Sequence, residues 1–102
     1  MKIGKHTAFM IDFISDFVNK DLERLFFDLD YSAYVIEHFP YMEFENPKLA
    51  DKFVNTIDRV YDRGTDLGLS DEDFRVEISY AFDKWLGNKK SEIIKMIKSG
   101  GI

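Results

Sequence analysis

Hydrophobic residues along the chain recur every three or four positions, which is the spacing of one face of an α-helix. In the first segment this spacing predicts a helix over residues 7–19. Thr7 is placed to cap its N-terminus, and Asn19-Lys20-Asp21 fits its exit. The apolar positions of this helix are Phe9, Met10, Phe13, Ile14, Phe17 and Val18.

The segment from residue 21 to 45 is rich in aromatic residues, and its pattern is less regular. It predicts two short helices, with Asp30 as the N-cap of the second. Pro40 lacks an amide hydrogen and clashes with the preceding turn, so we expect a kink or break near residues 36–39. The apolar positions are Leu22, Leu25 and Phe26 in the first helix and Tyr31, Tyr34, Val35, Ile36 and Phe39 in the second.

The second half of the chain carries clearer helix boundaries. Asn46 followed by Pro47 is a strong helix start, and Gly64 fits a left-handed residue that ends this helix. Ser70, followed by three acidic residues, predicts the next start, and Gly87 the next end. The apolar positions are Leu49, Phe53, Ile57, Val60 and Tyr61 in the first of these helices and Phe74, Ile78, Ala81, Phe82 and Trp85 in the second.

A last helix is predicted from Ser91, with Ile94 and Ile97 facing inward, and no segment reads as a convincing strand. Four main helices with short connections predict an all-α antiparallel bundle with short extra helical segments. The 102 residues suffice for one core, so we expect a single domain over 1–102. The absence of cysteine excludes disulfides and thiolate metal sites.

The charge of the chain is unevenly distributed around a net value of −5. Residues 12–83 hold 18 acidic and 7 basic side chains, whereas the tail 84–102 is basic. Between Leu25 and Pro47 there are five acidic side chains and no Lys or Arg. Such a surface repels nucleic acid and attracts basic proteins. The alternative is a solvated acidic face that only keeps the domain soluble.

Catalytic signatures are missing from the sequence. There is no zinc, di-iron, phosphate-loop, dinucleotide or serine-hydrolase motif, and His6 and His38 alone could act as bases at neutral pH. We therefore expect no catalytic residue, no cofactor and no metal, and a protein that is not an enzyme.

Residues 62–73 have the helix, acidic loop and helix outline of a calcium-binding EF-hand. Asp62, Asp66 and Asp73 would occupy positions 1, 5 and 12 of an EF-hand loop. Position 6, where the loop needs glycine, is Leu67, so a helix connector is the favoured interpretation.

Aromatic side chains between residues 26 and 44 are too numerous for one core. Phe26 and Phe27 are adjacent, and Tyr41, Met42 and Phe44 fall within four positions. Some of them must lie at the surface, where aromatic residues among carboxylates are typical anchors of a protein interface.

The stretch FDLDYSAYVIEHFPYMEFENPKLADKF at 27–53 resembles a family of bacterial immunity proteins. These are small helical partners of colicin D-like toxins and of the toxin tips of contact-dependent growth inhibition systems. The resemblance rests on F-D-L-D-Y-S, on the aromatic connection at 41–47, on the L-A-D-x-F that follows, and on DFRVEI at 73–78.

The resemblance implies a cytoplasmic bacterial protein that covers the basic active-site cleft of a toxin nuclease domain, commonly one that cleaves transfer RNA. Independently of the resemblance, the acidic surface predicts no direct contact with nucleic acid, and no apolar run approaches the ~18 residues of a membrane span, so we expect no membrane contact. We expect the free chain to be a monomer or a weak homodimer. Inhibition would work by occupancy, with slow release. The alternative is an acidic helical interaction module without a toxin partner. The residues expected to bind the partner are the acids Asp28, Asp30, Glu37, Glu43 and Glu45 and the apolar anchors Tyr41 and Phe44.

Overall fold

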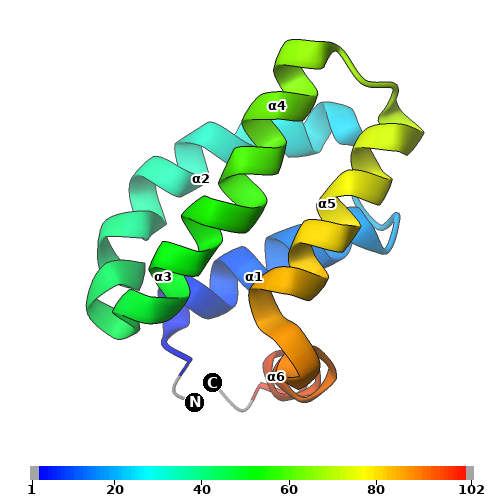
Figure 1. Cartoon of the computed structure of the whole chain (residues 1–102). Coiled ribbons are helices and arrows are strands. Elements are labelled where there is room, and N and C mark those ends of the chain that lie inside the picture. Colours follow the sequence, from blue (N-terminus) through cyan, green and yellow to red (C-terminus); the bar gives the residue numbers. More distant parts are fainter. Residues whose placement is uncertain (1–2, 101–102) are drawn as a thin grey trace.

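A computed structural model describes residues 3–100, and the chain folds into an all-helical bundle over this range (Figure 1). The elements are α1 (Lys5–Val18), α2 (Arg24–Glu45), α3 (Pro47–Phe53), the π-helix η1 (Val54–Asp58), α4 (Arg59–Leu67), α5 (Asp71–Leu86), the 3-10 turn η2 (Gly87–Lys89) and α6 (Lys90–Lys98). Because α3, η1 and α4 follow one another without a gap, they act as one long helix. The predicted bundle of four main helices plus short segments is confirmed.

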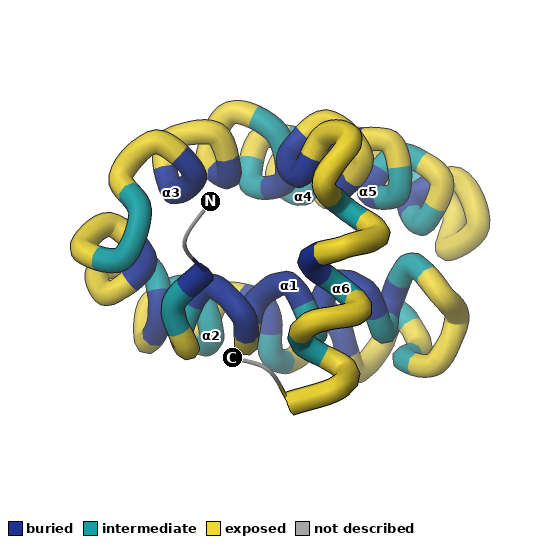
Figure 2. The backbone as a smooth tube through the Cα atoms, turned by 90° about the horizontal axis from the view of Figure 1, so that it is seen from below, coloured by how far each residue is buried: buried dark blue, intermediate teal, exposed yellow. Residues whose placement is uncertain are grey.

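The helices form two layers (Figure 2). One layer holds α1 and α2, with α6 beside α1, and the other holds α3, α4 and α5. The core between them is dominated by rings: the fully buried large side chains include Phe17, Phe27, Tyr31, Phe53, Phe74, Phe82 and Trp85. The indole nitrogen of Trp85 donates a hydrogen bond to the carbonyl of Leu49 at 2.9 Å, which satisfies its one polar atom inside the core.

The N-terminal boundary of α1 differs from the prediction. The helix begins at Lys5 with Gly4 as its N-cap, and Thr7 lies inside it and is buried. Thr7 is not needed as a cap because a side chain from α2 supplies the cap, as described below. The exit at Asn19 is confirmed, and Lys20 there adopts a left-handed conformation with φ 68°.

The predicted break in the aromatic segment is wrong, because α2 is one helix of 22 residues with Pro40 inside it. Asp30 accordingly lies within the helix, and Glu23 is the N-cap. Tyr31 and His38 before the proline and Met42 after it are buried in the same core. These contacts hold both halves of α2 in line and outweigh the local preference of proline for a break.

Gly64 does not end the helix that starts at Pro47. It is buried inside α4, where a Cβ atom would lie 2.6 Å from the ring of Phe74, so the glycine allows close packing of α4 on α5. The helix ends one turn later at Leu67, and Gly68 takes the left-handed conformation, with φ 63° and ψ 40°.

Side-chain caps mark the starts of α3 and α5 as predicted. Asn46 caps α3 by accepting a hydrogen bond from the Leu49 amide at 3.1 Å, and Ser70 caps α5 through the Asp73 amide at 3.2 Å. Gly87 ends α5 as predicted. The last helix begins at Lys90 rather than Ser91, and its buried residue is Ile93, beside the half-buried Ile94 and Ile97.

The basic C-terminal segment is partly used inside the molecule. The Lys98 ammonium reaches the carboxylates of Asp12 and Asp16 on α1, and Lys90 pairs with Asp83. Hydrogen bonding to Asp12 raises the pKa of Lys98 above its usual value. These pairs fasten α6 to the rest of the bundle. None of the helices between residues 3 and 100 is both long and apolar enough to cross a membrane.

Candidate protein-binding surface on α2

All seven residues that the sequence predicts to bind a partner lie on α2, but the structure divides them into three groups. They are Asp28, Asp30, Glu37, Tyr41, Glu43, Phe44 and Glu45. Two acids are engaged in internal contacts, three acids lie along the outer side of the helix, and two aromatic residues are exposed. The groups differ in what they can offer to another protein.

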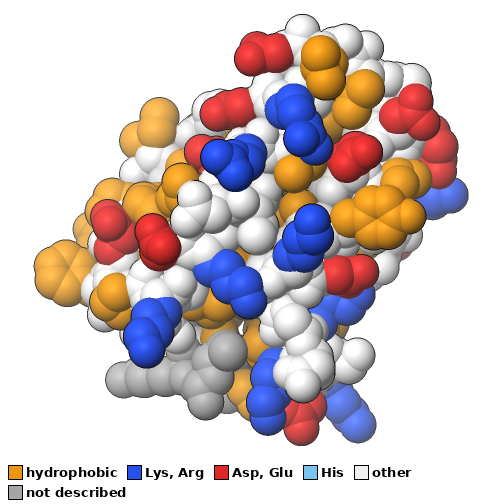
Figure 3. All heavy atoms as spheres, viewed as in Figure 1, with side chains coloured by type: hydrophobic (Ala, Val, Ile, Leu, Met, Phe, Trp, Pro, Cys, Tyr) orange, Lys and Arg blue, Asp and Glu red, His pale blue; other side chains and the backbone are white. Residues whose placement is uncertain are grey.

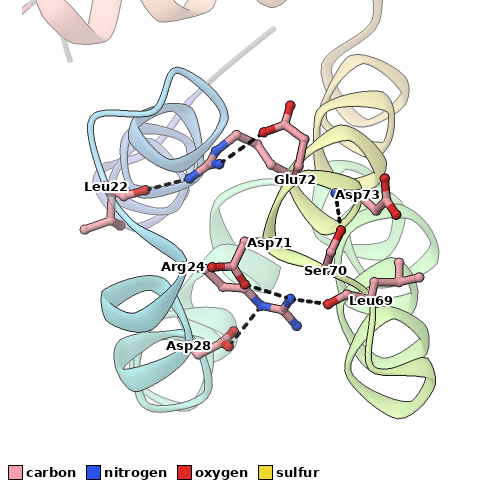
Figure 4. Close-up of polar contacts among 9 residues, drawn as sticks. Leu22, Arg24, Asp28, Leu69, Ser70, Asp71, Glu72 and Asp73 are labelled. Atoms are coloured by element: carbon pink, nitrogen blue, oxygen red, sulfur yellow. Dashed lines mark hydrogen bonds and ion pairs between the residues drawn. The ribbon is translucent and has the colours of Figure 1, made fainter.

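Asp28 belongs to an internal network at the start of α2 (Figure 4). Its carboxylate lies 3.3 Å from Nε of Arg24, and it contacts the hydroxyl of Tyr61. The Arg24 guanidinium also donates to the carbonyl of Leu69 and lies 3.3 Å from Asp71. Burial, followed by the Asp28 carboxylate, raises the pKa of Tyr61 to about 12. Asp28 therefore joins α2 to Tyr61 on α4, and Arg24 joins α2 to the connection between α4 and α5.

A second arginine strengthens the same end of the bundle. Arg75 on α5 donates to the carbonyl of Phe17 at 2.9 Å and to that of Leu22 at 3.5 Å, and it lies 3.9 Å from Glu72. Figure 4 shows the contacts made with Leu22 and Glu72. These bonds satisfy carbonyls where α1 ends and the chain turns toward α2. The two arginines thus fix the N-terminal end of α2.

Glu45 is the cap of α1. Its carboxylate accepts hydrogen bonds from the His6 amide at 2.9 Å, from the Thr7 amide at 2.8 Å and from the Thr7 hydroxyl at 2.7 Å. Gly4 allows this approach, since a Cβ there would overlap the Glu45 side chain. Burial alone would raise the pKa of Glu45, but these hydrogen bonds outweigh it and hold the pKa below its usual value. The role of Glu45 in the structure is to fasten α1 to α2.

Asp30, Glu37 and Glu43 are the acids left for a partner. Asp30 and Glu43 make no hydrogen bond or ion pair with any other residue between 3 and 100. The Glu37 carboxylate lies 3.2 Å from Nε2 of His38 but stays largely exposed. Helix geometry puts Asp30 and Glu37 along one side of the outer face and Glu43 along the other.

A histidine pair lies where α1 meets α2. The Nδ1 atoms of His6 and His38 are 2.8 Å apart, so one ring must accept a hydrogen bond and be neutral. His38 is buried and stacks on Phe9, whereas the half-exposed Tyr41 stacks on His6 with ring centroids 4.4 Å apart. Burial lowers the pKa of His38, and the nearby Glu37 and Glu45 carboxylates only partly oppose this. Tyr41 therefore presents an exposed ring that is held in place by the histidine behind it.

The feature that sequence reasoning missed is an apolar stripe along the outer face of α2, which we call the α2 ridge. Its large members stand out in solvent: Phe44 is 90% exposed and Ile36 is 77% exposed. All members fall within an arc of about 100° around the helix axis. In Figure 3 hydrophobic side chains gather along the edge of the molecule over α2. The α2 ridge consists of Leu25, Phe26, Leu29, Ala33, Ile36, Pro40 and Phe44.

The ridge was hidden in the sequence because the expected break at Pro40 separated its two halves. Residues 25, 29, 33, 36, 40 and 44 follow the helical spacing of three and four on the side of α2 opposite the core. Two apolar stripes on one helix would have been the signal. A helix that is apolar on two sides in a surface position exposes one of them to a partner or to solvent.

A cavity of about 230 Å³ lies beside the ridge, between α2 and the long α3–α4 helix. The rings of Tyr31 and Tyr61 line it and stack with their centroids 3.8 Å apart, and the Tyr31 hydroxyl donates a hydrogen bond to the Asp58 carboxylate at 2.9 Å. Burial, together with the carboxylates of Asp58 and Asp66, raises the pKa of Asp62. The cavity is lined by Tyr31, Ser32, Val35, Ile36, Asp58, Tyr61 and Asp62.

Among residues 3–100 no group of three or more His, Asp or Glu side chains is arranged to hold a metal ion. No protein-family model, curated protein or solved structure matches the chain.

Proposed function

We propose that this protein is an immunity-type inhibitor that binds the basic nuclease domain of a bacterial toxin and blocks its active site. The observation that carries the proposal is the outer face of α2, where acids without a neighbouring Lys or Arg flank exposed apolar side chains. Asp30, Glu37 and Glu43 supply the charge, and Tyr41 and Phe44 supply apolar anchors.

The proposed mechanism is occupancy. A nuclease holds its substrate through Lys and Arg side chains that neutralise phosphates, and carboxylates on α2 would occupy those positions. The negative field would speed association. The two aromatic anchors, once covered by the toxin, would slow release. Asp28 and Glu45 contribute to the field only, because their carboxylates are held by internal bonds. The inhibitor would act in the bacterial cytoplasm, where an RNA-cleaving toxin finds its substrate.

The test is protection and binding in the presence of the toxin domain from the neighbouring gene. The tagged chain is expressed with that domain, purified through a high-salt wash and assayed for protection of cells. Charge reversal by Asp30→Lys with Glu43→Lys should slow association and weaken protection. The control is Asp51→Lys with Asp73→Lys, which makes the same charge change at exposed positions on α3 and α5.

Two outcomes would contradict the proposal. One is the absence of a lethal basic domain that co-purifies with the chain. The other is equal protection by the two double variants, because the charge on α2 would then not matter.

The exposed ridge favours a second candidate, an acidic helical interaction module without a toxin partner. Such a module would bind more weakly and would depend on the apolar side chains more than on the acids. Alanine substitution of Ile36 compared with charge reversal at Glu43 separates the two candidates.

A further inference from the structure

The most unusual feature of the outer face of α2 is its exposed apolar side chains rather than its acids. From Leu25 to Phe44 the α2 ridge runs about 28 Å along the helix. Neither end of the ridge is covered by another element of residues 3–100, and Leu25, Leu29 and Ile36 are each at least 65% exposed. Contiguous apolar surface of this kind on a small monomer marks a protein-binding site.

The charges on both sides of the ridge determine what can cover it. Asp30 and Glu37 lie on one side and Glu43 on the other, and the segment holds no Lys or Arg. A second copy of this chain docked by the same face would set these acids against each other in an apolar, poorly screened contact. A partner that carries Lys and Arg along the borders of an apolar strip would instead pair with them.

The cavity between α2 and the long α3–α4 helix adds a specific position for one of those cations. The carboxylates of Asp58 and Asp62 line it, the stacked Tyr31 and Tyr61 rings line it too, and Ile36 of the ridge stands at its edge. The nearest arginine network is committed elsewhere, since Arg24 binds Asp28, Asp71 and the carbonyl of Leu69. Carboxylates with an aromatic surface are the environment that a guanidinium or ammonium group prefers.

We propose that the α2 ridge and this cavity form one docking surface for a partner protein that presents an apolar strip bordered by Lys and Arg, with one cationic side chain entering the cavity. The apolar side chains hold the complex, and the acids align it. The inference rests on the proposed function only in that both place a basic protein on the outer face of α2.

The first experiment uses a synthetic probe with this chemistry. A helical peptide of Leu and Lys, with Leu along one face, is titrated into the full-length chain, and binding is mapped by amide shifts in NMR. The matched control peptide has Glu in place of every Lys. The Lys peptide should shift amides along the outer face of α2 and around Asp58 and Asp62, and the Glu peptide should not bind.

Two pairs of variants make the mapping decisive. Leu29 and Leu67 are both 67% exposed, but Leu67 lies at the end of α4 and lines a depression with Val60, Leu69 and Glu77. Leu29→Ser should weaken binding of the Lys peptide about tenfold, as loss of a central apolar contact does, and Leu67→Ser should leave it unchanged. Asp62→Asn should weaken it more than Asp51→Asn.

Several results would overturn the inference: equal binding of the two peptides, shifts confined to another face, or equal effects of the two leucine variants. Sedimentation velocity adds another such result, because a dimer that Ile36→Ser dissociates would make a second copy the occupant.

Failure of the proposed function can be told apart from failure of the docking surface. If the toxin does not bind but the peptide maps to the ridge, the toxin assignment alone fails. If the toxin binds and both leucine variants protect equally, the docking surface fails.

Discussion

The two helices of the first layer, α1 and α2, both have aromatic-rich sequences, but they differ in how much of each helix is buried. Of the 14 residues of α1, eight are buried, whereas α2 buries only four of its 22. α1 packs against α2, α5 and α6, so most of its sides are covered. α2 lies at the edge of its layer, and its outer side meets solvent (Figure 2).

Apolar content along a helix therefore does not measure burial. The core side of α2 contributes Phe27, Tyr31 and Met42 with almost no exposure, which is enough to fix the helix in place. The apolar residues on its other side add nothing to the core. They are a cost in free solution, and such surface is retained where a partner covers it.

Two adjacent phenylalanines on α2 test this difference in burial most directly. Phe27 is fully buried, and Phe26 is 51% exposed on the ridge. Phe27→Ala should lower the free energy of unfolding by about 3–5 kcal/mol, because it leaves a cavity among stacked rings. Phe26→Ala should change it by about 0.5 kcal/mol or less. Chemical denaturation measures both, and equal losses would mean that α2 is oriented differently.

The second test concerns the proline inside α2. Pro40→Ala restores an amide that can bond to the carbonyl four residues earlier and removes a clash, so the free energy of unfolding should rise by about 1–2 kcal/mol. Pro47→Ala is the control, because proline at the first helical position is well tolerated and its removal should bring no gain. A loss of stability in Pro40→Ala would show that the helix depends on a bend there.

The third test compares two neighbouring acids. Glu45→Gln removes the charge from the carboxylate that caps α1 and should lower the free energy of unfolding by about 1 kcal/mol. Glu43→Gln, two positions away on the exposed side, should have no measurable effect on stability. Thermal and chemical unfolding measure the stability of both variants. Equal losses of stability would contradict the assignment of Glu45 as a cap.

The smallest expected effect is a pH dependence that comes from the contact between the two helices. Because the pKa of His38 is lowered in the folded state, the unfolded chain binds a proton that the folded chain does not. Stability should therefore fall as pH decreases below about 6.5, the ordinary value for histidine. In His38→Gln the slope of the unfolding free energy between pH 7.5 and 5.5 should flatten. An unchanged slope would show that other groups cause the pH dependence.

Local signals in the sequence were sufficient for the fold class and for the boundaries at Asn19, Asn46, Ser70 and Gly87. Asn46 and Ser70 cap their helices through their own side chains, and Gly87 ends α5 as predicted, because these signals act within one turn of the chain. All seven expected binding residues fall within residues 28–45, but the sequence predicted a break in this segment, and only the structure places them on one helix.

Tertiary structure decided the points at which distant residues compete with local preference. Packing on both sides of Pro40 keeps α2 continuous, the ring of Phe74 explains Gly64, and Glu45 replaces Thr7 as the cap of α1. Whether a carboxylate is tied or open, and which of two apolar stripes meets the core, depends on what lies across from it. The sequence by itself determined that α2 is acidic and apolar. Only the packing of the other helices determined which of its side chains remain free for a partner.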